Sequence, residues 1–378
     1  MTKFNLLQLV PNLESGGVEQ GTLDVANFQA DSKNKNYIIS NGGKMLSYLN
    51  KSYVEHYKLP VHSKNIFRMP FTAKKINIFI EKKKINILHV RSRAPAWLLP
   101  YLNKNKLKTI STFHNVYGSQ NIVKKIYNRQ LANVDKIVAI SNYVKNEISK
   151  TYKIEPEKIN IINRGTDTNF FNINENQIDK FYDRKNINLE KKIILYPGRL
   201  TEWKGQIEFL EVVEKFIHKP VIFYFAGDNK NSSYYNKFIK VLSKKKLNHK
   251  CHLLGHLNKD ELRMMYRCSD IIISAPIRPE GFGRTISESL SMKKIVLAYN
   301  YGGVSDQLDK LNDLYKITPL DSNEMKEKID LALNLKQDNI MNMGEVARSH
   351  IIKNFSKEKM LSLYNELYED ILHWKIFW

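Results

Sequence analysis

Two glutamates, Glu280 and Glu288, flank what the sequence predicts to be one corner between a strand and a helix. The apolar, β-branched run 270–274 predicts a buried parallel strand, and the Pro- and Gly-rich stretch after it predicts a loop that leads into a helix. A carboxylate at such a corner can accept hydrogen bonds from neighbouring hydroxyls, as on a sugar ring or a ribose. Gly281 and Gly283 would let backbone N–H groups approach that ligand without a Cβ in the way.

A second corner carries positive charge. Gly198 and Arg199 follow the apolar strand predicted for 192–197, and Lys204 lies shortly after them. A guanidinium offers a planar fork of donors and an ammonium offers a point charge, so the two could clamp a pyrophosphate and stabilise a departing phosphate. By this pattern alone they could also be solvated residues beside an ordinary turn, because short motifs give many false matches.

Two pairs of glycines stand where a strand is predicted to lead into a helix. Gly16 and Gly17 follow the first predicted strand, and Gly302 and Gly303 precede Val304 after the strand predicted for 294–298. The free N–H groups and positive dipole end of a helix suit an anion. Together the two corners predict a phosphorylated ligand between the two halves of the chain.

His114 stands at the end of another predicted strand, 108–112. A lone histidine can be packed, exposed or functional, and its place at a strand's carboxyl end keeps the functional interpretation open. No other side chain stands beside it at metal-ligand spacing. The chain contains no Asp-x-Asp, so the sequence predicts no metal ion on a diphosphate, and no other cofactor.

Composition indicates a globular protein of more than one domain. The chain has 378 residues, of which 42% are hydrophobic and 26% charged. Two cysteines, Cys251 and Cys268, match no zinc spacing and favour a reducing compartment. The sequence shows no apolar run of membrane-spanning length and no signal-peptide layout at its start, so we expect a cytoplasmic protein.

The formal net charge is +22, and the first 170 residues contribute most of it, with 27 Lys and Arg against 11 Asp and Glu. A coding bias that scatters lysines over solvated surfaces would explain this excess of positive charge. Contact with anionic lipid at the inner face of the cytoplasmic membrane would explain it as well. Nucleic acid is not expected, because no recognition helix or aromatic-interleaved basic stripe is present. The final segment 356–378 predicts a helix whose terminal aromatics, Trp374, Phe377 and Trp378, could dock on lipid or fold back onto the first domain.

Short apolar strands alternate with amphipathic stretches, which predicts βαβ units and parallel sheets. The predicted strands are 4–10, 36–40, 85–90, 108–112, 136–140, 159–163, 192–197, 220–226, 251–254, 270–274, 294–298 and 314–317. A polar, Asn-rich stretch near 171–190 predicts a linker. We therefore expect a domain of residues 1–170 completed by the helix 356–378, and a second domain of residues 191–355.

In their order along the chain, these motifs resemble those of the retaining glycosyltransferases of family 4. Glu280 and Glu288 match that family's Glu-x7-Glu motif, and 198–205 matches its donor-phosphate clamp. Gly16-Gly17 matches its N-terminal glycine loop, and 163–167 resembles the Arg-Gly-x-Asp segment that closes the acceptor domain. The stretches 90–97, 112–114 and 201–206 are similar to a bacterial subgroup that makes lipopolysaccharide and other glycans.

The resemblance implies an α/β protein of the GT-B fold, in which two Rossmann-like doubly wound domains face each other across a cleft. It also implies transfer of a sugar, with retention and without a metal, from a nucleotide-diphosphate sugar to a carbohydrate or glycolipid hydroxyl. Arg199 and Lys204 would hold the diphosphate, Glu288 the ribose, and Glu280 the donor sugar, which His114 would face from the other domain. The implied catalytic residues are His114, Arg199, Lys204 and Glu280; the donor-binding residues are Gly16, Gly17, Gly198, Arg199, Lys204, Leu254, Gly255, His256, Leu257, Glu280, Gly281, Phe282, Gly283, Glu288, Gly303 and Val304; and the acceptor-side residues are Arg91, Arg93, Asn115 and Arg164.

Two alternatives remain open from the sequence. A nucleotide-sugar epimerase shares the two-domain fold, and an isomerised nucleotide sugar formed without acceptor would reveal it. A basic module that binds nucleic acid or membrane would show salt-sensitive retention on DNA and no thermal response to nucleotide sugars.

Overall fold

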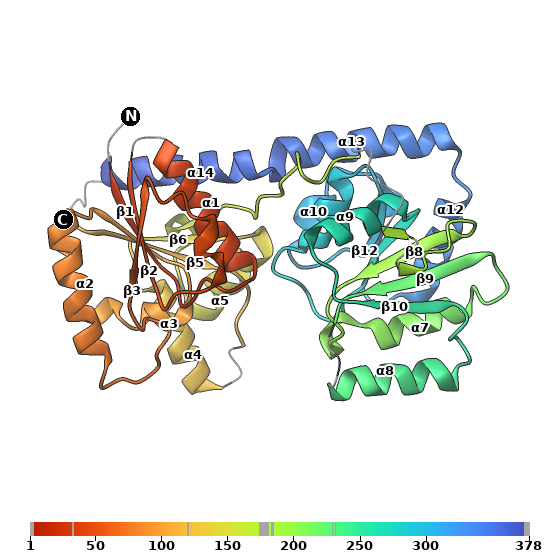
Figure 1. The fold of residues 1–378 in the computed structure, drawn as a ribbon, viewed down its shortest axis with the longest axis horizontal. Helices are drawn as coiled ribbons and strands as arrows, with labels where there is room; N and C mark the ends of the chain where they lie inside the picture. The colour runs from red at the N-terminus through yellow and green to blue at the C-terminus, as the bar shows by residue number, and fades with distance from the viewer. Residues whose placement is uncertain are drawn as a thin grey trace. The chain divides into compact units, whose positions relative to one another are not determined.

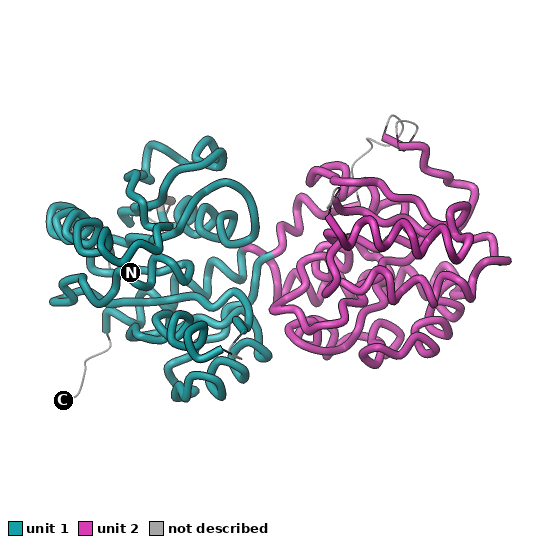
Figure 2. The backbone as a smooth tube through the Cα atoms, turned by 90° about the horizontal axis from the view of Figure 1, so that it is seen from below, with its two compact units in different colours: residues 1–165, 358–378 teal, residues 166–357 magenta. Residues whose placement is uncertain are grey.

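The structure, a computed structural model, describes residues 4–31, 34–118, 121–173, 181, 182, 185–228, 230 and 232–373. They form two compact units, residues 1–165 with 358–378 and residues 166–357 (Figure 2). Each unit is built on one parallel sheet with helices packed against it (Figure 1). This α/β architecture with two parallel sheets confirms the predicted fold class.

The sheet of unit 1 has the strand order β3-β2-β1-β4-β5-β6-β7, so the direction of winding reverses between β1 and β4. Its strands are β1 (Asn5–Leu9), β2 (Lys35–Ser40), β3 (Val54–Lys58), β4 (Ile87–Val90), β5 (Lys108–Phe113), β6 (Lys136–Ala139) and β7 (Ile159–Ile161). The sequence did not predict β3, because as an edge strand it buries only Val54 and shows no apolar run. The helices are α1 (Gly17–Asp31), α2 (Met69–Lys83), α3 (Arg93–Ala96), α4 (Ile122–Arg129), α5 (Asn142–Tyr152) and α14 (Lys357–His373), with 3₁₀ turns η1 (Lys44–Tyr48), η2 (Leu99–Tyr101), η3 (Gln130–Ala132) and η4 (Pro156–Lys158).

The sheet of unit 2 has the order β10-β9-β8-β11-β12-β13, with its reversal between β8 and β11. Its strands are β8 (Lys192–Pro197), β9 (Val221–Ala226), β10 (Cys251–Gly255), β11 (Ile271–Ser274), β12 (Ile295–Tyr299) and β13 (Lys316–Ile317). Its helices are α7 (Gln206–Glu214), α8 (Ser233–Lys244), α9 (Lys259–Cys268), α10 (Arg284–Ser291), α11 (Val304–Leu308), α12 (Ser322–Leu333) and α13 (Gln337–Phe355), with 3₁₀ turns η5 (Glu202–Lys204) and η6 (Asp313–Tyr315). β9 and β11 are buried along their whole length, which explains why both read as continuous apolar runs.

The C-terminal helix α14 belongs to unit 1 and closes its core. Its apolar stripe, which includes Tyr364, Leu367 and Tyr368, packs against Leu6 of β1 and Ile110 of β5. The described part of this helix therefore packs against the sheet of unit 1. The terminal aromatics Trp374, Phe377 and Trp378 lie outside the described residues.

The chain leaves unit 1 and returns to it through two paired segments. Thr166 forms a parallel bridge with Ser356, and the N–H of Lys357 donates to the carbonyl of Thr166 at 2.8 Å. The structure divides the chain between 165 and 166, and Phe171 is buried in unit 2. Of the predicted linker 171–190, residues 174–180, 183 and 184 lie outside the described residues.

Candidate functional site

In unit 2, the candidate residues lie at the carboxyl ends of adjacent strands, the edge at which open α/β sheets bind ligands. Backbone hydrogen bonds join three of these strand ends. The N–H of Gly198, after β8, donates to Ala226 of β9 at 2.7 Å, and the N–H of Gly227 donates to Gly255 of β10 at 2.9 Å. The structure thus brings the segment Leu254–Leu257 to the same edge as Gly198 and Arg199.

Lys204 and Glu280, which are far apart in the sequence, form an ion pair at this edge. Their side chains are only 14% and 11% exposed, so the pair lies largely out of water. The ammonium also lies 4.6 Å from the ring centroid of Trp203. The Tyr196 hydroxyl donates to the Lys204 carbonyl and helps to fix the turn that presents the lysine. The predicted phosphate-binding cation and sugar-binding carboxylate therefore meet at one position.

The loop after β12 is in close contact with the loop that carries Glu280. A Cβ on Gly303 would lie 2.1 Å from the carbonyl oxygen of Gly281, so only glycine fits there. The N–H of Gly303 donates to the carbonyl of Glu280 at 2.8 Å. This N–H, which the sequence analysis assigned to the diphosphate, is therefore already occupied in this structure. From α11, which begins at Val304, the buried Gln307 donates through Nε2 to the Phe282 carbonyl and further fixes the corner.

Glu288 lies on α10, whose start is set by Gly283 in the left-handed conformation. Its Oε2 accepts a hydrogen bond of 3.0 Å from the hydroxyl of Tyr266 on α9. Burial raises the pKa of Glu288 above its ordinary value, although the charge of Arg284 and the Tyr266 hydrogen bond oppose this. Arg199, by contrast, has an exposed side chain. The edge therefore combines an exposed cation, a shielded ion pair and a shielded carboxylate.

In unit 1, His114 is held by two hydrogen bonds at the carboxyl end of β5. Arg164 Nη2 lies 2.8 Å from His114 Nδ1, and His114 Nε2 lies 2.9 Å from the carbonyl oxygen of Arg91. Arginine can only donate, so Nδ1 must accept and Nε2 must carry the proton. Burial, together with the positive charges of Arg164 and Arg91, lowers the pKa of His114 well below its ordinary range. This histidine is neutral, with both ring nitrogens engaged.

Arg164 also ties the glycine loop to this cluster, because its Nη1 donates to the carbonyl of Gly17 at 2.5 Å. Gly16, just before it, has a φ of 125°. One helical turn later, a Cβ on Gly21 would lie 2.8 Å from Arg164 Nη1 and 3.2 Å from Arg91 Nη2. A side chain at Gly21, a residue that the motifs did not single out, would therefore displace the guanidinium ends of Arg164 and Arg91 from α1.

Arg91 is buried, and its Nε has no hydrogen-bond partner among the described residues. Its guanidinium lies over the ring of Tyr364 at 5.2 Å and beside His89, with 3.4 Å between Nη1 and Nδ1. His89 in turn bonds the Tyr368 hydroxyl and the Thr112 hydroxyl, at 2.7 Å each. Helix α14 therefore supports the acceptor-side edge through buried polar contacts.

The other two acceptor-side candidates lie nearer the surface. Arg93 donates to Asn128 of α4 at 3.2 Å, and its guanidinium stacks 4.2 Å from the ring centroid of Tyr117. The Asn115 side chain accepts from the N–H of Val116 and is exposed. The structure thus brings Arg91, His114 and Arg164 together, whereas the hydrogen bonds of Arg93 and Asn115 go to Asn128 and Val116.

Sequence reasoning missed the residues that support these candidates. Tyr266 holds Glu288, Gln307 holds the loop at Phe282, and His89 and Tyr368 lie beneath Arg91. Tyr266, Gln307 and Tyr368 come from elements distant in sequence from the residues they support, whereas His89 stands two residues before Arg91; none of the four belongs to a recognisable motif.

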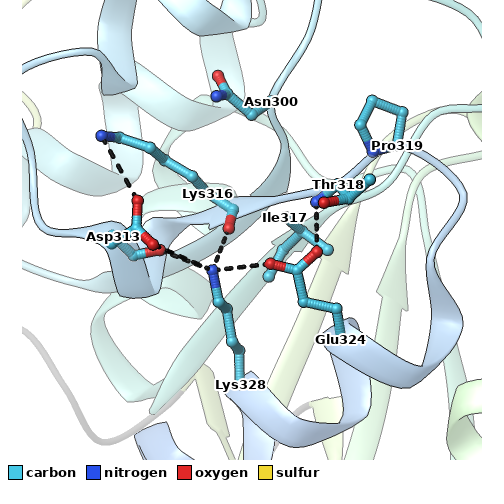
Figure 3. Close-up of a pocket in the computed structure, with 8 residues that line it drawn as sticks. All are labelled: Asn300, Asp313, Lys316, Ile317, Thr318, Pro319, Glu324 and Lys328. Carbon is cyan, nitrogen blue, oxygen red and sulfur yellow. Dashed lines mark hydrogen bonds and ion pairs between the residues drawn. The ribbon is translucent and has the colours of Figure 1, made fainter.

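A pocket of about 360 Å³ opens at the end of β13, and none of the candidate residues lines it (Figure 3). Lys328 lies 2.9 Å from Glu324 and 3.9 Å from Asp313. The charged side chains that line this pocket therefore neutralise one another. Within the described ranges, no three His, Cys, Asp or Glu side chains gather where they could hold a metal ion. No helix in the described part of the chain is both long and apolar enough to cross a membrane.

Two family descriptions match this chain. Residues 15–170 match Glycosyltransferase Family 4, and residues 177–350 match Glycosyl transferases group 1. The crystal structure of a glycosyltransferase from Rickettsia africae is 36% identical, covers 98% of this chain and 99% of its own, and superposes with a TM-score of 0.88. An uncharacterized glycosyltransferase from Methanocaldococcus jannaschii is 27% identical over 90% of this chain and 87% of its own length.

The Anabaena protein HepE, whose crystal structure contains UDP-glucose, shares the fold. Its identity is 16% and its TM-score 0.80, with 97% of this chain and 100% of that chain covered.

Proposed function

This chain belongs to the group 1, family 4 glycosyltransferases, and we propose that it transfers a hexose from a UDP-sugar to a hydroxyl of a carbohydrate or glycolipid. Dependence on a nucleotide sugar and retention of the anomeric configuration follow from the family. The UDP-glucose complex of HepE supports uridine as the base, which would contact the segment Leu254–Leu257. The observation that carries the proposal is the largely buried Lys204–Glu280 pair at the carboxyl edge of the sheet of unit 2.

The residues of unit 2 would divide the donor among them. Glu288 accepts hydrogen bonds from the ribose hydroxyls, while Glu280 accepts from hydroxyls of the sugar. Arg199 and Lys204 stabilise the negative charge that grows on the diphosphate as the bond to the anomeric carbon breaks, in place of a metal ion. A donor that engages Glu280 with its hydroxyls weakens the hold of that carboxylate on Lys204, and so leaves the ammonium to the phosphate.

In the reaction we propose, the acceptor oxygen bonds to the anomeric carbon on the face from which the diphosphate departs. The acceptor proton passes to an oxygen of the leaving phosphate, so no protein base is required. His114 fits this scheme as a neutral hydrogen-bonding group, because both of its ring nitrogens are engaged.

The acceptor side would be formed by Arg91, Arg93, Asn115 and Arg164, and the pathway would be the synthesis of cell-surface polysaccharide or lipopolysaccharide in the cytoplasm. The similarity of three stretches to a bacterial glycan-synthesis subgroup supports this assignment, as does the basic character of the first 170 residues.

A panel of UDP-, GDP- and ADP-sugars tests the proposal by thermal shift and by slow release of the nucleotide. We expect a UDP-sugar to give the largest shift, and we expect turnover to persist in a chelator. Arg199→Ala should lower transfer about 100-fold or more without lowering the melting temperature, because it removes a fixed donor to developing charge from an exposed position. Lys237→Ala, at an exposed position on α8, is the control. Wild-type transfer by folded Arg199→Ala and Glu288→Ala variants would refute the assignment, and an isomerised nucleotide sugar formed without acceptor would indicate an epimerase.

A further inference from the structure

Unit 1 exposes a group of bulky apolar side chains on two segments. The first segment is the loop before α2 with the start of that helix, where Phe67 is 80% and Phe71 73% exposed. The second is α4, in which Asn128 alone is buried. The group consists of Ile66, Phe67, Phe71, Ile122, Val123 and Ile126, and is called the apolar tip below. Large exposed apolar groups of this kind mark interaction surfaces rather than ordinary solvated faces.

The two segments lie near each other. Lys64 of the first segment lies 5.8 Å from the ring centroid of Tyr127 on α4. Both segments follow the carboxyl end of a strand, β3 in one case and β5 in the other. Figure 1 accordingly shows the start of α2 and the start of α4 at the same, lower end of unit 1. The apolar tip is therefore one surface, built on the same sheet edge as the acceptor-side residues.

Basic residues surround the apolar tip. Between 56 and 134 the chain contains sixteen Lys and Arg but a single acidic residue, Glu81. The basic side chains adjoining the tip are all exposed: Lys64, Arg68, Lys74, Lys75, Lys124, Lys125 and Arg129. A coding bias would scatter lysines evenly, whereas this stretch has almost no acidic residues where the apolar side chains are exposed.

We propose that the apolar tip docks unit 1 onto an anionic lipid surface. Exposed Phe and Ile side chains can enter the boundary between headgroups and acyl chains, and flanking Lys and Arg are attracted to anionic headgroups. Charge complementarity selects lipid phosphates as the partner, and the bulky aliphatic and aromatic side chains select a membrane over a fully solvated polyanion. For the terminal helix, the sequence left open docking on lipid or folding back onto the first domain; the described aromatics of α14 are buried in unit 1, and Trp374, Phe377 and Trp378 lie outside the described residues.

Docking would bring the acceptor side close to the headgroups. Arg93 donates to Asn128 of α4, and Trp97 Nε1 donates to the Tyr127 carbonyl at 3.1 Å, so α4 is bonded to the segment that carries Arg93. This consequence rests on the proposed function, whereas the docking itself does not.

Sedimentation with phosphatidylcholine vesicles, with or without phosphatidylglycerol, tests the docking without turnover. We expect binding only to the phosphatidylglycerol vesicles. The triple variant Lys124→Gln/Lys125→Gln/Arg129→Gln should bind about 100-fold more weakly, since each basic residue near an anionic surface contributes about fivefold. The matched control, Lys237→Gln/Lys240→Gln/Lys244→Gln, removes the same charge from exposed positions on α8 of unit 2 and should bind as the wild type does.

The apolar contribution has its own pair of variants. Phe67→Ser/Phe71→Ser should bind at least about tenfold more weakly, because each inserted side chain contributes through its buried apolar area. Leu331→Ser/Met341→Ser, at exposed positions of unit 2, should have no effect. All variants should keep the wild-type thermal response to UDP, which separates a failure of docking from a failure of the proposed function.

Three results would overturn the proposal. The first is equal binding to the two kinds of vesicle, and the second is equal weakening by the α8 triple variant. The third is a dimer in sedimentation that Phe67→Ser/Phe71→Ser abolishes while vesicle binding persists, because it would assign the apolar tip to a second copy of the chain.

Discussion

Replacing Glu280 by glutamine tests whether the ion pair with Lys204 both stabilises unit 2 and serves the donor site. At an effective dielectric of about 20, two unit charges in contact attract by about 5 kcal/mol, and desolvation cancels part of this gain. Removing one partner of a buried pair costs about 3–5 kcal/mol, because the other charge is left unpaired. Since the side chains are 14% and 11% exposed, we expect the lower end, about 3 kcal/mol.

For a unit of this size, that loss lowers the melting temperature by roughly 10 °C. Lys204→Met should be similarly destabilising. The double variant Lys204→Met/Glu280→Gln leaves no unpaired charge, so it should return to within about 1 kcal/mol of the wild type. Transfer of sugar should be lost in all three variants, because each lacks a group that the proposed function places against the donor.

UDP without sugar gives the sharpest readout. In Glu280→Gln the Lys204 ammonium has lost its carboxylate partner, so it should bind the diphosphate more tightly and give a larger thermal shift than the wild type. The double variant should give a smaller shift than either. Equal thermal shifts with UDP in all variants would refute the reasoning. So would a loss of stability in the double variant that equals the sum of the losses in the two single variants.

Three further predictions concern single residues. Because burial raises the pKa of Glu288, and its ionised form is the better acceptor for ribose hydroxyls, UDP affinity measured by calorimetry should fall on acidification at a higher pH than an ordinary glutamate would give. Glu288→Gln should remove this dependence, and an unchanged pH profile would contradict the assignment. Gly21→Ala should destabilise unit 1 by about 1–3 kcal/mol in denaturant unfolding, whereas Gly118→Ala, whose Cβ would have nothing within 4 Å, should not. Tyr368→Phe should cost about 1–2 kcal/mol, because it removes the shorter contact of the buried Nδ1 of His89 and leaves only Arg91 Nη1 at 3.4 Å; an unchanged unfolding midpoint would show that the Arg91 contact suffices.

The local pattern of apolar residues along the sequence determined the architecture of both units. The predicted strands correspond to every strand of both sheets except β3, because a parallel strand buried on both faces must be apolar throughout. Edge strand β3 carries Glu55, His56 and Lys58 beside its one buried valine, so no local signal marked it.

The sequence alone also determined where the candidate site residues stand. Glu280, Arg199 and His114 each follow an apolar run, and the carboxyl ends of parallel strands share one edge of a sheet. Residue type and strand end therefore sufficed to select these candidates.

Tertiary structure alone decided which partners hold the candidate residues and which protonation state each of them has. The proton of His114 sits on Nε2 because Arg164 approaches from another strand end, and the pKa of Glu288 is raised because helices α9 and α10 bury it. Lys204 meets Glu280 only because β8 and β11 are neighbours in the sheet. Burial and long-range pairing depend on chain segments that fold together from distant positions, so no window of sequence contains them.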